Sequence, residues 1–203
     1  MTLAMKYLTD SDVKTLEQKA NEIRQSTIEM LIEAGSGHTA GPLGMADIFT
    51  LLYFEVMRHD PKDPDWEERD RLILSNGHIC PGLYATLAHA GYFPEEELLT
   101  LRTFGSRLQG HPHRTALPGI ETSSGPLGSG LSQAVGMALA ERMEALRVGD
   151  GMEEGTVIGP LIDAQGLEKV ERHVADARAK GAQIVTGGAR HGNGGLFYQP
   201  TLV

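Results

Sequence analysis

Apolar residues recur every three or four positions along several stretches of this chain, which is the period of an amphipathic helix. The clearest stretch covers residues 12–34, where Ser11 or Asp10 is a natural N-cap and Gly35 a natural stop. The residues 45–56 carry only two charges, so we expect a helix buried on most sides. Further helices are expected over residues 82–90, 94–104, 130–146 and 167–180.

Two short apolar runs predict strands. Residues 71–75 lead into a loop with a glycine, and residues 183–186 end at Gly187 and Gly188. Helices that alternate with short strands predict an α/β architecture with few strands.

Composition and charge change together near Leu146. Fourteen of the 25 glycines lie in residues 1–146 and 11 in the remaining 57, so the glycine density doubles, while the net charge goes from −8 to −1. We therefore expect two domains, residues 1–146 and 147–203.

The overall charge narrows the classes of partner. With 27 acidic and 18 basic residues the net charge is −9, which disfavours nucleic acid and anionic membrane surfaces because both are polyanions. Cys80 is the one cysteine of the chain and permits no internal disulfide. No apolar run is long enough to span a bilayer and no signal peptide is evident, so we expect a soluble cytoplasmic protein.

Three histidines, His38, His78 and His111, each follow a glycine in a predicted loop. Histidine donates and accepts protons near neutral pH, which makes all three candidate catalytic groups. A single histidine of this kind is more often structural or on the surface, and three in similar contexts weaken that interpretation. Zinc is a competing interpretation, but no two of these residues have the short spacing typical of zinc ligands.

A glycine-rich turn, residues 124–130 (SGPLGSG), directly precedes a predicted helix. Such a turn lets the backbone approach a ligand closely and points free amides at an anion, although it can also be a plain loop-to-helix cap. The candidate binding residues are Gly125, Pro126, Leu127 and Gly128.

The order of these motifs resembles the amino-terminal, thiamine diphosphate-binding part of transketolase, most closely the form that is split into two polypeptides. The resemblance covers about residues 11–143 and rests on GSGHTAGPLGMAD (35–47), RDRLILSNGH (69–78), GHP (110–112), TSSGPLGSG (122–130) and AVGMA (134–138). It implies an incomplete thiamine diphosphate-binding α/β fold that is rich in helices and has few parallel strands.

The resemblance also implies roles. His38, His78 and His111 would line the sugar channel, hydrogen-bond the donor's oxygens and move protons, while Gly125 and Leu127 would contact the cofactor rings through backbone atoms. The reaction would transfer a two-carbon ketol unit between sugar phosphates, as in the pentose phosphate pathway, with thiamine diphosphate as electron sink. The glutamate that activates the cofactor belongs to the family's other domain, so a transketolase carboxyl-terminal chain or a homo-oligomer is expected as partner.

The second segment, about residues 145–203, resembles an internal stretch of an aldehyde dehydrogenase of the succinate-semialdehyde type. The motifs are VGDGMEEG (148–155), IGPLI (158–162), VERHVADA (170–177) and GLFYQPT (195–201). That family's nucleophilic cysteine and general base lie outside this stretch. Cys80 cannot replace them, because it belongs to the transketolase-like part, and we expect it to be a buried thiol.

The run Gly149-Asp150-Gly151 with Glu154-Gly155 also resembles the transketolase motif that binds magnesium and the diphosphate, which makes Asp150 the candidate metal ligand. It departs from the family pattern: no full apolar strand precedes it, the spacing is one residue short, and the later asparagine is missing apart from the distant Asn193. We expect a poor magnesium site.

Three functions remain open from the sequence. The first is a transketolase amino-terminal subunit that needs a second chain, and the second is an inactive truncated fusion of transketolase and aldehyde dehydrogenase pieces. The third is a dehydrogenase fragment that keeps affinity for an aldehyde or a nucleotide. The length predicts that neither parent active site is complete in this chain.

Overall fold

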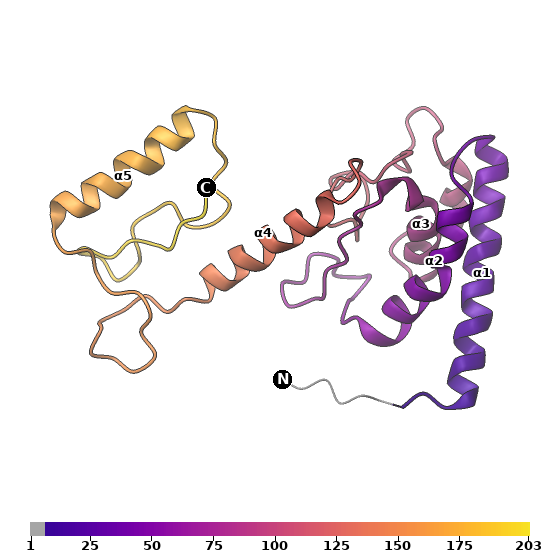
Figure 1. Ribbon diagram of the computed structural model, residues 1–203, viewed down its shortest axis with the longest axis horizontal. Coiled ribbons are helices and arrows are strands. Elements are labelled where there is room, and N and C mark those ends of the chain that lie inside the picture. The colour runs from indigo at the N-terminus through magenta and orange to yellow at the C-terminus, as the bar shows by residue number, and fades with distance from the viewer. Residues whose placement is uncertain (1–6) are drawn as a thin grey trace. The chain divides into compact units, whose positions relative to one another are not determined.

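The computed structural model describes residues 7–203 and divides into two compact units, Met1–Gln133 and Ala134–Val203 (Figure 1). Unit 1 contains three α-helices, the π-helical turn η1 and the 3-10 turns η2 and η3, while α5 belongs to unit 2 and α4 crosses the division. Their bounds are α1 Asp10–Ala34, α2 Ala40–Leu51, η1 Leu52–Val56, η2 Gly77–Ile79, α3 Cys80–His89, η3 Glu95–Thr100, α4 Ser129–Glu144 and α5 Ala164–Ala179.

Helix α1 begins at Asp10, one residue before the start that an Asp10 cap predicts and two before that of a Ser11 cap. Its N-cap is Thr9, whose side chain accepts a hydrogen bond from the Asp12 amide at 3.2 Å while the Asp12 carboxylate accepts from the Thr9 amide at 2.9 Å. The prediction of Ser11 or Asp10 was wrong because this reciprocal pair satisfies two free amides at once. The predicted stop is confirmed, since Gly35 ends α1 in the left-handed region at φ 60°.

The predicted helix over residues 45–56 exists but is longer and less buried than expected. It runs as α2 from Ala40 and continues through η1. Ala46, Phe49 and Tyr53 are buried, whereas Ile48 is 50% exposed. One face of the helix thus packs on its neighbours, and the expectation of burial on most sides was wrong.

The core of unit 1 forms where α1, α2 and α3 pack side by side (Figure 1). Tyr84, Phe49 and Ile23 are among its fully buried side chains. Helices α2 and α3 approach closely because Gly82 has no side chain: a Cβ there would lie 3.0 Å from the Pro42 carbonyl oxygen. α3 is therefore buried along almost its whole length.

The strand predicted over residues 71–75 does not form. The segment has no regular secondary structure and Leu74 is buried, but no described segment pairs with it as a second strand. A strand needs a partner that takes up its amides and carbonyls, and within residues 7–203 the β pairing is limited to three isolated bridges, all between residues 148 and 202. The helix predicted over 94–104 is likewise reduced to the short turn η3.

Unit 2 is built around α5, whose N-cap Asp163 accepts a hydrogen bond from the Gly166 amide at 2.7 Å. Leu167, Val174 and Tyr198 form its small core. The strand predicted over residues 183–186 is reduced to the antiparallel bridge between Thr186 and Leu202.

These observations confirm the expected fold class, an incomplete α/β domain that is rich in helices, with a small α/β fragment after it. The two compact units divide after Gln133, inside α4, which runs from Ser129 to Glu144. The predicted domain boundary near Leu146 stays a prediction. Among the residues described, no helix combines the length and the apolar character needed to cross a bilayer.

Candidate functional site

His38 lies in the five-residue connection between α1 and α2, where two glycines set the path of the backbone. Gly35 and Gly37 both have positive φ, 60° and 140°, and a Cβ on Gly37 would overlap the Leu31 side chain of α1. The connection is thus held against α1 while the His38 side chain stays exposed.

His78 lies in η2 at the entrance to α3, not in the irregular loop that the sequence suggested. Its ring centroid is 4.9 Å from that of His38, with 56° between the ring planes. The preceding Gly77 is required by a close approach, because a Cβ there would lie 2.8 Å from the Ser124 carbonyl oxygen. The structure therefore brings the first two candidate histidines together and sets them beside the glycine-rich turn.

His111 is exposed in a loop that is tied to α3. The Tyr84 hydroxyl donates to the Gln109 carbonyl at 3.0 Å, and the Cys80 thiol lies 3.4 Å from the Gly110 carbonyl oxygen, which accepts its weak hydrogen bond. Cys80 begins the helix that His78 leads into, so the segments that carry His78 and His111 are anchored at the same end of α3.

The glycine-rich turn is held by two hydrogen bonds to Ser75. The Gly128 amide donates to the Ser75 carbonyl at 3.2 Å, and the Gly130 amide to the Ser75 hydroxyl at 3.0 Å. Gly128 has a φ of 84°, which favours glycine. Pro126, Leu127 and Gly128 are exposed and Gly125 is half-buried.

Two groups of this turn have no protein partner in the described residues. A Cβ on Gly125 would meet no atom within 4 Å, so its backbone faces open space. The Ser124 hydroxyl is buried and has no hydrogen-bond partner, which is unusual for a buried polar atom. The Ser124 amide donates to the Pro112 carbonyl at 3.3 Å and thereby joins the turn to the His111 loop.

Arg102 belongs to this site although no sequence motif pointed to it. Its guanidinium donates to the Ser36 hydroxyl at 3.1 Å and lies against Gly110, so it touches the loops of both His38 and His111. The contact joins residues 66 positions apart, which sequence spacing cannot reveal.

Burial decides the chemistry of the cysteine. It raises the pKa of the Cys80 thiol to about 12 and also raises that of the Tyr84 hydroxyl. Cys80 is therefore a protonated thiol that anchors the His111 loop, and its burial confirms the buried thiol expected from the sequence.

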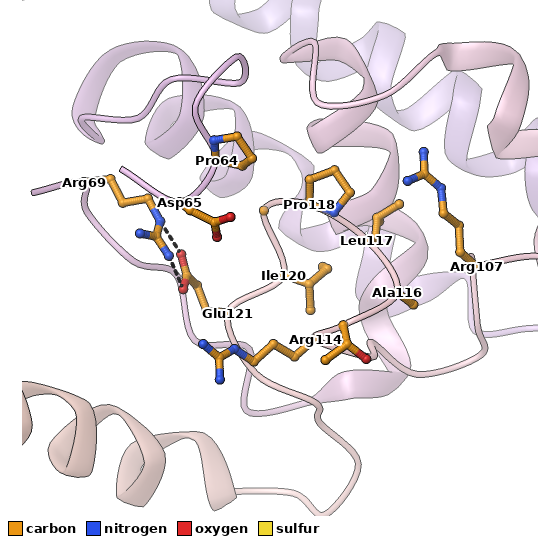
Figure 2. A pocket seen from close by; sticks show the side chains of 12 residues that line it. Pro64, Asp65, Arg69, Arg107, Arg114, Ala116, Leu117, Pro118, Ile120 and Glu121 are labelled. Carbon is orange, nitrogen blue, oxygen red and sulfur yellow. Dashed lines mark hydrogen bonds and ion pairs between the residues drawn. The ribbon is translucent and has the colours of Figure 1, made fainter. Parts of the chain in front are cut away.

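A separate cleft of about 350 Å³ lies on residues 64–69 and 114–121 (Figure 2). Arg69 and Glu121 form a buried bidentate pair along its wall, at 3.0 and 2.9 Å, and Arg114 extends beside them. None of the three candidate histidines lines this cleft. Its main charges neutralise one another, so we attribute a structural role to the pair.

Asp150 lies in unit 2, in a loop that closes on itself. Its carboxylate accepts from the Met152 amide at 2.9 Å, and Arg147 donates to the Glu154 carbonyl at 2.6 Å and to the Glu153 carboxylate at 2.9 Å. Within residues 7–203, no three His, Cys, Asp or Glu side chains gather in a way that could hold a metal ion.

Two family models match parts of this chain. The family model described as "Transketolase, thiamine diphosphate binding domain" matches residues 15–156. The chain belongs to the transketolase family. A second model, "Aldehyde dehydrogenase family", matches residues 129–203, which is less than half of the chain and leaves that family unestablished here.

Curated transketolases are similar in sequence. The chloroplastic transketolase of Spinacia oleracea is 46% identical over 147 residues, which cover 71% of this chain and 20% of that protein. Transketolase 2 of Escherichia coli strain K12 is 48% identical over 124 residues, which cover 61% of this chain and 19% of that protein. The "6-deoxy-6-sulfo-D-fructose transketolase subunit SqwG" of Clostridium sp. strain MSTE9 is 45% identical over 149 residues, covering 70% of this chain and 54% of that subunit.

Solved transketolase structures share the fold of about two thirds of this chain. The enzyme from Leishmania mexicana has a TM-score of 0.61 and 44% identity over 63% of this chain and 19% of its own. The transketolase from Campylobacter jejuni has a TM-score of 0.59 and 39% sequence identity, and the match covers 64% of this chain and 20% of that enzyme. The chain thus spans about a fifth of the full transketolases and about half of the Clostridium subunit.

Proposed function

We propose that this chain is the thiamine diphosphate-binding subunit of a two-chain transketolase, which transfers a two-carbon ketol unit between sugar phosphates. The observation that carries the proposal is the convergence of the loops of His38, His78 and His111 with the glycine-rich turn. These four segments are separated along the sequence, and each is tied to another by a contact between named atoms.

The cofactor's ring end fits the residues of unit 1. Pro126, Leu127 and Gly128 are exposed, the half-buried Gly125 has open space beside it, and the unpartnered Ser124 hydroxyl lies at the same turn. Backbone atoms of Gly125 and Leu127 would hold the rings, with Pro126 and Gly128 shaping the turn. When bound, thiamine diphosphate supplies an electron sink for the carbanion that forms when the ketol unit leaves the donor sugar.

The histidines provide hydrogen bonds and proton transfer. His38 and His111 are exposed and His78 is half-buried, so their imidazoles are accessible to a sugar beside the turn. An imidazole nitrogen of each would donate to a sugar oxygen or carry a proton from a hydroxyl during bond cleavage. The contact between the His38 and His78 rings keeps these two imidazoles at neighbouring positions.

The structure gives less support for a magnesium site that would hold the cofactor's diphosphate. Asp150 is the candidate that the motif provides for magnesium, but its carboxylate is engaged by its own turn and no cluster of ligands surrounds it in the described residues. We derive no step through the metal. Replacing Asp150 by alanine is expected to leave cofactor affinity unchanged, and a loss of binding would establish Asp150 as a ligand.

The similarity to a transketolase subunit supports the proposal of a partner chain. The Clostridium relative is itself named a subunit, and the glutamate expected to activate the cofactor lies in the family's other domain. We propose a transketolase carboxyl-terminal chain as the partner, with a homo-oligomer as the alternative, in the cytoplasm.

A thermal-shift titration tests the proposal. A ligand that binds only the folded state raises the melting temperature, so thiamine diphosphate with magnesium should raise it, alone or after addition of a transketolase carboxyl-terminal chain. Thiamine monophosphate with magnesium is the control. Absence of any shift at millimolar cofactor, with and without the second chain, would refute the enzyme function.

The second candidate is an inactive fusion of a transketolase piece with an aldehyde dehydrogenase piece. The match of the aldehyde dehydrogenase model to residues 129–203 favours it, and the two family matches overlap over residues 129–156. The fusion predicts that neither thiamine diphosphate nor a nicotinamide cofactor shifts the melting temperature. Affinity for an aldehyde or a nucleotide would favour the dehydrogenase fragment.

A further inference from the structure

Arg102 contacts both the loop that carries His38 and the loop that carries His111. One guanidinium nitrogen, Nη1, donates to the Ser36 hydroxyl at 3.1 Å, and Ser36 lies two residues before His38. The same group lies on Gly110, where a Cβ would be 2.8 Å from Nε and 3.0 Å from Nη2. Gly110 directly precedes His111, so one side chain touches both connections.

The backbone at Arg102 has an unfavourable conformation. Among residues 7–203, Arg102 is the single non-glycine residue with a positive φ, 60°. Its amide donates to the Leu108 carbonyl at 2.9 Å, which closes the loop, and the preceding Leu101 is buried in the core. A left-handed conformation at a residue with a side chain persists only where the surrounding contacts hold it, and it directs the arginine away from the core and onto the two loops.

Its contacts differ from those of the other arginine in the same loop. Arg107 is bound by the Glu97 carboxylate at 2.5 and 2.8 Å and lies over the Phe93 ring. In the part of the chain that the structure describes, no carboxylate pairs with Arg102, whose polar contact is a neutral hydroxyl. An ion pair is thus not the reason for its position.

We propose that Arg102 is a positioning residue that sets the separation of His38 and His111 and thereby the width of the sugar site. This inference rests on the proposed function. The planar guanidinium has donors on several edges, so it contacts two loops at once, which a lysine ammonium does not reproduce. Because the His38 ring contacts the His78 ring, a shift of the Ser36 connection also reaches His78.

The test uses the full chain labelled with ¹³C in its histidine rings. Arg102→Ala is expected to move the ring resonances of His38, His78 and His111, and Arg102→Lys should not restore them. Gly110→Ala, which keeps the arginine but displaces its guanidinium, should move the resonances of His38 and His111 as well. Arg107→Ala removes an arginine from the same loop and should leave all three in place.

The proposal is overturned if Arg102→Ala leaves the histidine resonances unchanged, or if Arg107→Ala produces the same changes. Circular dichroism identifies a variant that fails to fold, and Arg102→Lys and Gly110→Ala then decide the question. These spectra need no cofactor. Movement of the resonances in a chain that never binds thiamine diphosphate would therefore support the positioning role and refute the proposed function.

Kinetics with a transketolase carboxyl-terminal chain provide the second readout. Misplacing the histidines should lower kcat by roughly 100-fold, since an error of about 1 Å in a reactive arrangement has an effect of that order. The Kd for thiamine diphosphate should stay the same, because Arg102 touches the histidine loops and not the turn at residues 125–128. A parallel loss of cofactor affinity would identify a general structural defect and overturn the proposal.

Discussion

Two glycines of the site lack a side chain for different reasons. At Gly77 a Cβ would lie 2.8 Å from the Ser124 carbonyl oxygen, a backbone atom that cannot move aside without shifting the turn. At Gly125 a Cβ would meet no atom within 4 Å. One glycine allows two segments of protein to approach, and the other leaves backbone accessible to a ligand.

Gly77→Ala should therefore destabilise unit 1 by about 1 to 3 kcal/mol, the usual effect of overpacking. Gly125→Ala is the matched control and should change the free energy of unfolding by less than about 0.5 kcal/mol while weakening cofactor binding. Urea unfolding measures the first effect and a thermal-shift titration the second. A destabilised Gly125→Ala chain would contradict this division of roles.

Cys80 supplies a second prediction at the scale of the residue. Burial raises the pKa of its thiol to about 12, so the reactive thiolate is scarce at pH 8. Iodoacetamide should label the native chain far more slowly than the chain in denaturant, as measured by mass spectrometry. Rapid labelling of the folded protein would show that the anchor between α3 and the His111 loop is open.

At the scale of the element, His89 joins α1 to the end of α3. Its Nε2 lies 3.0 Å from the Ser26 hydroxyl and its Nδ1 lies 3.7 Å from the Glu95 carboxylate. Burial lowers the pKa of His89 below its usual 6.5, which outweighs the opposite influence of Glu95. The folded chain thus takes up a proton on this ring less readily than the unfolded chain.

The stability linked to His89 is complete above pH 6.5 and is lost as the pH falls through the interval between 6.5 and the lower folded pKa. Urea midpoints at pH 7.5 and 5.5 should differ for this reason, and His89→Gln should reduce the difference. The Arg107 guanidinium lowers the pKa of Glu97, so the stability linked to that carboxylate is complete above its usual 4.5 and is constant between pH 5.5 and 7.5. An unchanged pH dependence in His89→Gln would assign the effect to another group.

At the scale of the whole molecule, the two apolar cores share no residue. The core of unit 1 is drawn from residues 23–120 and that of unit 2 from residues 161–198. A chain that ends at Leu146 should therefore keep the melting temperature of unit 1 within about 4 °C, a shift that corresponds to roughly 1 kcal/mol. Calorimetry of the full chain should resolve one unfolding transition for each unit. If the truncated chain loses the transition of unit 1, independent folding of that unit is refuted.

Helical elements were predictable from the sequence because their hydrogen bonds are local. The period of three to four apolar positions located α1, α3, α4 and α5, and Gly35 marked the end of α1 correctly. Strands were not predictable in the same way, since the run at 71–75 needs a partner elsewhere in the chain and finds none in the described residues. The sequence also did not show that one face of α2 is exposed, because the burial of a helix face depends on which other elements pack against it.

Local periodicity and ordered motifs were sufficient to locate α1, α3, α4 and α5, to identify the family of the amino-terminal part and to single out the candidate histidines. Only the tertiary structure decided that the His38 and His78 rings lie 4.9 Å apart, that Ser75 fastens the glycine-rich turn, and that Arg102 touches two histidine loops. Contacts between residues tens of positions apart depend on how the helices pack, and no spacing along the chain encodes that distance.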